Sequence, residues 1–81
     1  MYYVYILKSL KTHNKFYVGF TSNLEKRLAE HADPKKDSYT YRHFPWKLET
    51  YTVFNNQSNA KAFESYLKTG SGRTFLKKHL V

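Results

Sequence analysis

The chain has 81 residues, of which 41% are apolar and 19% aromatic, and it contains no cysteine. This length allows a single domain, residues 1–81, with a small core, and the missing cysteine excludes disulfides and thiolate metal sites. A net charge of +8, from fourteen Lys and Arg against six Asp and Glu, indicates a polyanionic partner, nucleic acid rather than a membrane surface.

Two β-strands are predicted at the start of the chain, residues 2–8 and 15–20, because both are rich in β-branched and aromatic side chains. The polar link between them is short and therefore predicts an antiparallel hairpin. Alternation places Tyr5 and Tyr17 on the same face of this hairpin. Gly19, next along that face from Tyr17, is expected to leave a space that a helix or a substrate backbone could approach.

A helix is predicted over residues 23–32. Ser22 is its expected N-cap, and Glu25 three residues later would complete a capping box. At 100° per residue, His31 falls on the apolar side of the helix and Arg27 lies at the edge of that side. Both polar groups are therefore expected to lean inward.

Residues 33–45 are expected to form a long, polar and basic loop that contains three aromatic side chains. A loop of this length in a small domain is typically functional or mobile. The Thr-rich, aromatic stretch from Trp46 to Phe54 predicts a third strand.

Two further helices are predicted, one over about residues 59–69 and one ending near Leu80. Ser58 and Ser71 are their expected N-caps, and Gly70 is expected to close the first of them. The predicted fold class is α+β, with a three-stranded, mostly antiparallel sheet, flanking helices and the element order β-β-α-β-α-α.

Glu64 lies on the flank of an apolar stripe on the helix 59–69, partly withdrawn from water. A carboxylate in such a place needs a partner. One partner is Lys68, four residues on, in an ordinary helical ion pair. The other is a hard divalent cation such as Mg²⁺, which often uses one or two carboxylates together with water and phosphate oxygens.

Each of the remaining polar candidates has an ordinary structural role when taken alone. Tyr5 and Tyr17 suit core aromatics, Arg27 suits a surface cation with a packed stem, and His31 suits a satisfied buried histidine. Together with Glu64, however, they are the groups that phosphodiester hydrolysis needs, since that chemistry depends on positioning and on stabilising charge at the phosphoryl oxygens.

These residues also carry a resemblance to a known family. The order Tyr3-Val4-Tyr5, Tyr17-Val18-Gly19, Arg27, His31 and Glu64 resembles the GIY-YIG nuclease domain, and the likeness covers almost the whole chain. The segments 16–28 and 45–48 look like the signatures of its small single-domain (UPF0213-like) members. Two departures stand out: the first motif reads Tyr-Val-Tyr, and no asparagine follows Asn59, whereas many active relatives have one after the glutamate.

The resemblance implies a divalent-metal-dependent endonuclease that hydrolyses DNA phosphodiester bonds, in repair or processing. It implies that Tyr17 positions or deprotonates the attacking water, that Arg27 holds the scissile phosphate and that Glu64 binds Mg²⁺ or Mn²⁺. Tyr5 would support the phosphate, and His31 could assist as the base. An alternative is a module of the same fold that only binds nucleic acid, and another is a protein-interaction domain.

The expected partner is nucleic acid, DNA before RNA. The cations expected to contact it are Lys15, Lys35, Lys36, Arg42, Lys47 and Arg73. A chain this short indicates weak sequence preference, a recruiting protein partner or a homodimer. No apolar run approaches the roughly 20 residues that span a bilayer. With no signal-peptide pattern after Met1, a cytoplasmic location without membrane contact is expected.

Overall fold

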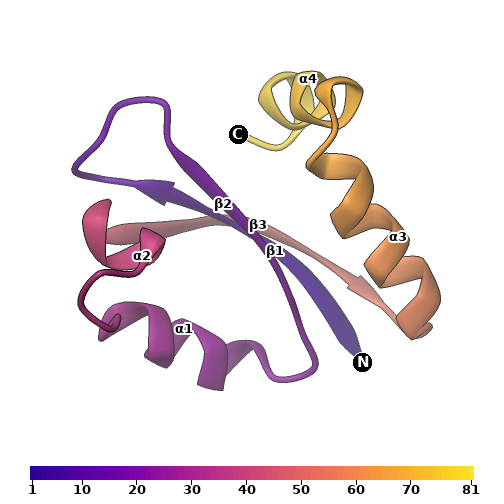
Figure 1. Cartoon of the computed structure of the whole chain (residues 1–81). Helices are drawn as coiled ribbons and strands as arrows, with labels where there is room; N and C mark the ends of the chain where they lie inside the picture. Colours follow the sequence, from indigo (N-terminus) through magenta and orange to yellow (C-terminus); the bar gives the residue numbers. More distant parts are fainter.

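The computed structural model describes all of residues 1–81 as three strands and four helices (Figure 1). In chain order these are β1 (Tyr2–Ser9), β2 (Phe16–Thr21), α1 (Leu24–Ala32), α2 (Tyr39–Arg42), β3 (Trp46–Phe54), α3 (Gln57–Leu67) and α4 (Gly70–His79). The predicted α+β class and the three strands are confirmed. The short helix α2 is an addition to the predicted order.

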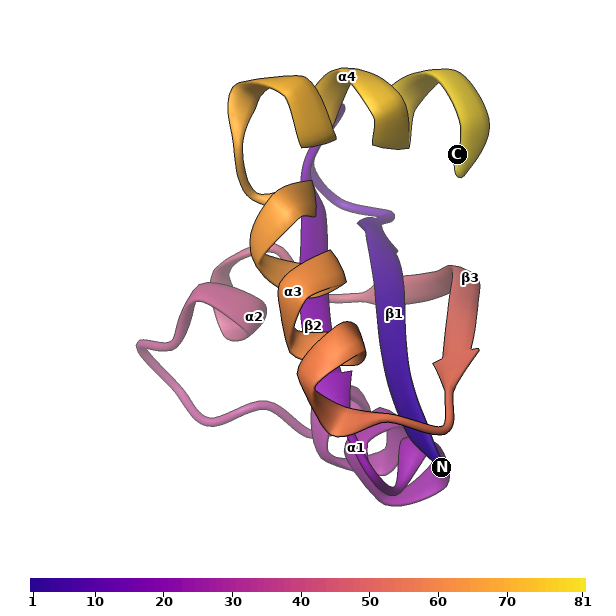
Figure 2. The same ribbon diagram turned by 90° about the vertical axis from the view of Figure 1, so that its right-hand side faces the viewer.

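The three strands form one antiparallel sheet in the order β2-β1-β3, so the first strand of the chain is the central one. The predicted hairpin places Tyr5 opposite Gly19 on β2, and Tyr51 on β3 faces Tyr5 from the other side. Helices α3 and α4 cover one face of the sheet, and α1 lies on the opposite side (Figures 1 and 2).

Strict alternation along β1 divides its side chains between the two faces. Val4 and Ile6 are buried under α3 and α4, in a core cluster completed by Ala60, Leu67 and Leu76. Tyr5 and Leu7, also buried, point to the other face, toward α1. The central strand therefore supplies the core on one side and a buried tyrosine on the other.

The predicted cap of α1 is wrong by one residue. Asn23, not Ser22, is the N-cap, and its side-chain oxygen accepts a hydrogen bond of 3.1 Å from the backbone N–H of Lys26. Asparagine and serine cap helices about equally well, so the sequence alone does not decide between adjacent candidates. The helix ends at Ala32 as expected, before Pro34.

The predicted boundaries of the last two helices also need correction. Asn56 caps α3 and Thr69 caps α4, two residues before the expected Ser58 and Ser71. Gly70 does not close α3 in a left-handed conformation, because no glycine of the chain has positive φ; it is the first residue of α4.

The long segment 33–45 contains the helix α2, which Ser38 caps by accepting a hydrogen bond from the Tyr41 backbone N–H. Four residues are too few for helical periodicity to be visible in a sequence. The indole N–H of Trp46 donates to the Thr40 carbonyl over 2.8 Å and ties α2 to β3. None of the helices has the length and apolar character needed to cross a membrane.

Candidate active site

The site is built around Tyr5, in the middle of the central strand. Its side chain is completely buried, and its hydroxyl lies 2.8 Å from Nε2 of His31 on α1. His31 is the one buried residue of α1, so the inward lean predicted for it is confirmed. A hydrogen bond between two buried polar side chains from separate elements fixes α1 against the sheet.

Tyr17 on β2 lies beside this pair, on the same face of the sheet as predicted. Its ring centroid is 4.8 Å from that of His31 and 6.2 Å from that of Tyr5. The open space expected at Gly19 is not there. A Cβ on Gly19 would overlap the ring and hydroxyl of Tyr5, so the missing side chain makes room for the tyrosine and not for a ligand.

The electrostatics of the site keep Tyr5 protonated. Burial raises the pKa of Tyr5 well above its ordinary value, and the nearby phenol of Tyr17 and carboxylate of Glu64 add to the rise. The positive charge of Arg27 opposes this rise in part. Tyr5 is therefore a hydrogen-bonding group and not a base. Arg27, Tyr17 and Glu64 thus all act electrostatically on the Tyr5 hydroxyl.

His31 is held neutral. Burial lowers its pKa, the positive charge of Arg27 lowers it further, and Glu30 partly counteracts both. At pH 7 the imidazole is uncharged, with one ring nitrogen as a donor and the other as an acceptor. Because Nε2 is engaged with the Tyr5 hydroxyl, His31 acts on its surroundings through that hydrogen bond.

Arg27 lies one turn before His31 and remains partly open to solvent, with 43% of its side chain exposed. Its Nε lies 3.2 Å from Oε1 of Glu30. A guanidinium has five N–H donors in a planar fork, so four remain for another partner. That geometry suits a phosphate, which accepts two such donors at once.

The side chain of Glu64, on α3, is 22% exposed. This agrees with its predicted position beside the apolar stripe, partly withdrawn from water. Its Oε2 lies 3.3 Å from Nζ of Lys68, so the predicted helical ion pair is present. No group of three His, Cys, Asp or Glu side chains is close enough to form a complete metal site. The side chains therefore do not form a preformed zinc site. The single carboxylate of Glu64 is a donor of the type that Mg²⁺ takes together with water and substrate oxygens.

Comparison with known proteins places this geometry in a family. The model of the GIY-YIG catalytic domain matches residues 1–78. The chain belongs to the GIY-YIG family. This confirms the predicted resemblance to the family and supports a nuclease-type fold with a nucleic-acid substrate.

Several UPF0213 proteins are relatives of this chain by sequence identity. A UPF0213 protein of Clostridium perfringens is 40% identical over 84% of this chain and 71% of its own length. One from Staphylococcus haemolyticus is 37% identical over 94% of this chain and 90% of its own. The solution structure of a UPF0213 protein of Bacillus halodurans superposes with a TM-score of 0.58 at 26% identity, covering 95% of this chain and 82% of that one.

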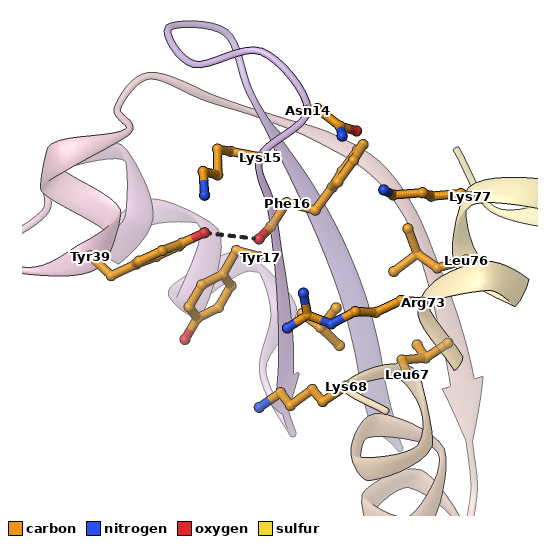
Figure 3. Close-up of a pocket in the computed structure, with 11 residues that line it drawn as sticks. Asn14, Lys15, Phe16, Tyr17, Tyr39, Leu67, Lys68, Arg73, Leu76 and Lys77 are labelled. Carbon is orange, nitrogen blue, oxygen red and sulfur yellow. Dashed lines mark hydrogen bonds between the residues drawn. The ribbon is translucent and has the colours of Figure 1, made fainter. Parts of the chain in front are cut away.

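Two of the six predicted nucleic-acid contacts of this GIY-YIG domain meet. Lys15, before β2, and Arg73, on α4, line a single pocket of about 380 Å³ at the β2 edge of the sheet, together with Tyr17 (Figure 3). The remaining four are not part of this pocket: Lys35 and Lys36 lie between α1 and α2, Arg42 ends α2, and Lys47 on β3 lies 3.8 Å from Glu49.

Two residues of this pocket were not singled out from the sequence. Tyr39, in α2, lines the pocket, and Lys77, on α4, enters it from the opposite side. The signal for Tyr39 was the aromatic content of the basic segment 33–45. Lys77 gave no signal in the sequence, because its approach to β2 depends on how α4 packs against α3.

Proposed function

We propose that this GIY-YIG domain is a divalent-metal-dependent endonuclease that hydrolyses DNA phosphodiester bonds in repair or processing. The observation that supports this most directly is the arrangement around Tyr17. Its ring lies against the buried Tyr5–His31 pair, and Arg27 acts electrostatically on both members of that pair. A rigid, buried hydrogen bond behind a partly exposed phenol is typical of a preorganised site.

In this proposal each side chain has a distinct task. Arg27 binds the non-bridging oxygens of the scissile phosphate through its free N–H groups. Tyr17 orients the attacking water, and the neutral His31, through its hydrogen bond to Tyr5, keeps both phenols in place. Glu64 would hold Mg²⁺ or Mn²⁺, which supplies neutralisation of charge at the phosphoryl oxygen and the leaving oxygen.

The test is a nicking assay on supercoiled plasmid in the presence of Mg²⁺ or Mn²⁺. Arg27→Ala removes a charge-stabilising donor, which typically lowers a rate by about 10²–10³-fold. Lys26→Ala is the matched control, because it removes a neighbouring exposed cation from the same helix. Equal nicking by Arg27→Ala and Lys26→Ala would contradict the proposed role of Arg27.

A second candidate is a module that binds nucleic acid without cutting it. The pairing of Glu64 with Lys68 favours this, because an ammonium group already occupies the carboxylate expected to bind the metal. The lack of an asparagine after Asn59 points the same way. Binding that weakens steeply with salt, without nicking at any concentration of Mg²⁺ or Mn²⁺, would select this candidate.

A further inference from the structure

A basic pocket borders the candidate active site at the edge strand β2. Side chains from three separate regions meet there: Lys15 from the loop before β2, Lys68 from the end of α3, and Arg73 from α4 (Figure 3). Tyr17 lines this pocket and also lies against His31. The pocket and the candidate active site are therefore continuous through one residue.

The charge of the pocket is entirely positive. Four of its lining side chains are cations, Lys15, Lys68, Arg73 and Lys77, and none is a carboxylate. The ion pairs of the chain involve Arg27, Lys47 and Lys68, so three of these four cations have no carboxylate within 4.0 Å. The three unpaired cations, gathered around a concave surface, are suited to an anionic ligand.

The floor of the pocket is apolar. Phe16 and Val18 of β2 are half-buried and supply the apolar surface that a ligand can reach, and the core residues Leu67 and Leu76 lie behind them. Its volume of about 380 Å³ is at the lower end of the range for small-molecule sites. A pocket of this volume with an apolar floor suits an organic ligand that carries an anionic group. A bare anion would need only the cations.

Tyr39 forms a rigid wall on the α2 side. Its hydroxyl donates to the Phe16 carbonyl over 3.3 Å, and its ring stacks on Trp46 with centroids 6.0 Å apart and planes inclined by 28° (Figure 3). The centroids of Tyr39 and Tyr17 are 6.4 Å apart. With 39% of its surface exposed, Tyr39 offers an aromatic surface already fixed before a ligand binds.

We propose that this pocket binds one nucleotide of the substrate strand, adjacent to the phosphate that Arg27 holds. The phosphate of that nucleotide pairs with Arg73, Lys77 and Lys15. Its base packs on the apolar floor beside Tyr39, as bases do on aromatic side chains in strand-binding proteins. This inference rests on the proposed function for its position relative to the cut bond, but the nucleotide site itself is measurable without cleavage.

Binding is measured with thymidine 5′-monophosphate at low ionic strength, where charge interactions are least screened. Trp46 is the only tryptophan of the chain, and it stacks on Tyr39, so its fluorescence reports on this wall of the pocket. We expect the nucleotide to bind more tightly than inorganic phosphate or thymidine, because it alone uses both the cations and the apolar floor. Equal affinity for nucleotide and inorganic phosphate would reduce the pocket to an anion site and overturn the proposal.

The residues are tested by the double variant Arg73→Gln/Lys77→Gln. Hydrogen bonds to charged groups contribute enough that we expect a loss of about 10-fold or more in nucleotide affinity. Lys78→Gln is the control, since Lys78 lies on the same helix, next to Lys77, but does not line the pocket. A double variant that binds the nucleotide as tightly as Lys78→Gln does would overturn the assignment.

Amide chemical shifts of the unaltered protein give a second measurement that does not depend on how the variants fold. Shifts on addition of thymidine 5′-monophosphate should concentrate at residues 14–18, Tyr39 and residues 67–77. Shifts concentrated elsewhere would place the nucleotide outside this pocket and contradict the proposal.

The nucleotide site and the nuclease activity can fail separately. Arg27→Ala should lower nicking by about 10²–10³-fold and leave nucleotide binding within about twofold of the parent, because Arg27 does not line the pocket. If the parent protein does not nick DNA but binds the nucleotide through Arg73 and Lys77, the proposed function is wrong and the nucleotide site stands. If it nicks DNA but does not bind the nucleotide, the reverse holds.

Discussion

The hydroxyl of Tyr5 lies 2.8 Å from Nε2 of His31, and both side chains are buried between the sheet and α1. This hydrogen bond joins the central strand to the helix that bears Arg27. It therefore links the position of the candidate phosphate-binding cation to the middle of the sheet, and the first two predictions concern it.

Removing the two phenolic hydroxyls should have different consequences. Tyr5→Phe leaves Nε2 of His31 without its partner, and an unsatisfied buried group costs about 1–3 kcal/mol of unfolding free energy. Tyr17→Phe alters a half-buried side chain whose ring packing is kept. This variant should therefore lose less unfolding free energy than Tyr5→Phe, and its nicking rate should fall more. Urea unfolding and plasmid nicking, measured on both variants, check this. Equal losses of unfolding free energy in the two variants would contradict the assignment of Tyr5, and not Tyr17, as the structural tyrosine.

Gly19→Ala, on the neighbouring strand β2, should disturb the hydrogen bond between Tyr5 and His31. The new Cβ would overlap the Tyr5 ring and hydroxyl and push them away from His31, and such overpacking typically costs about 1–3 kcal/mol. Gly70→Ala is the control, because a Cβ at Gly70 meets nothing within 4 Å. Urea unfolding should show a large loss for the first variant only. A Gly19→Ala protein as stable as the parent would mean that Tyr5 moves without cost.

The stability of the fold should depend on pH through His31, whose folded pKa is lowered by burial and by Arg27. As the pH falls below about 6.5, the ordinary pKa of histidine, the unfolded chain gains a proton that folded His31 does not accept. The unfolding free energy should thus be highest above this pH, fall with the pH, and level off below the lowered pKa. His31→Gln should flatten the profile measured by urea unfolding.

His43→Gln is the comparison for that profile, because the pKa of His43 is also lowered, by burial and by the cations Lys15, Arg42 and Lys11. It should remove only its own share of the pH dependence. A profile that is unchanged by His31→Gln and flattened by His43→Gln would assign the effect to the α2 end of the molecule.

Freeing Glu64 from its ion pair should strengthen metal binding. In Lys68→Gln the carboxylate no longer shares its charge with an ammonium group 3.3 Å away, and an ion pair of this kind contributes enough for about a two- to fivefold gain in Mn²⁺ affinity. Water-proton relaxation, measured without nucleic acid, reports the bound Mn²⁺. Lys78→Gln is the matched loss of charge, and Glu64→Gln should abolish the binding. Mn²⁺ bound equally well by Glu64→Gln would exclude Glu64 as the ligand.

The corrected start of α1 is testable by a pair of adjacent substitutions. Asn23→Ala removes the cap of the Lys26 N–H and should cost about 1 kcal/mol of unfolding free energy. Ser22→Ala lies outside the cap, and its effect should stay within about 0.5 kcal/mol. Urea unfolding distinguishes the two. A larger loss for Ser22→Ala would restore the capping box expected from the sequence.

The strands and the shared face of Tyr5 and Tyr17 were predictable because they depend on local alternation, which a sequence displays directly. His31 was placed inward for the same reason, since helical periodicity fixes which side of α1 it occupies. The hydrogen bond between Tyr5 and His31 was not predictable. It depends on how far α1 sits from the sheet, and that distance is set by packing across the whole domain.

The errors at the helix ends have a common cause. Asn23, Asn56 and Thr69 each have a serine within two residues, and the choice between such candidates depends on where the preceding strand or helix stops. The pocket residues Tyr39 and Lys77 are a different case. They lie far apart in the sequence and line one pocket only because α2 and α4 flank the edge of β2 from opposite sides.

The placement of β1 at the centre of the sheet has a consequence for how such a protein can change. Val4 and Ile6 pack in the hydrophobic core on one side of the sheet, while Tyr5, between them, is hydrogen-bonded to His31 on the other side. A substitution that shifts this strand to improve core packing therefore also moves the hydrogen bond between Tyr5 and His31, and a substitution at Tyr5 in turn disturbs the core residues on either side of it. The solvent-exposed positions of α4 are not under this double constraint, so substitutions there should be tolerated more easily than substitutions along β1.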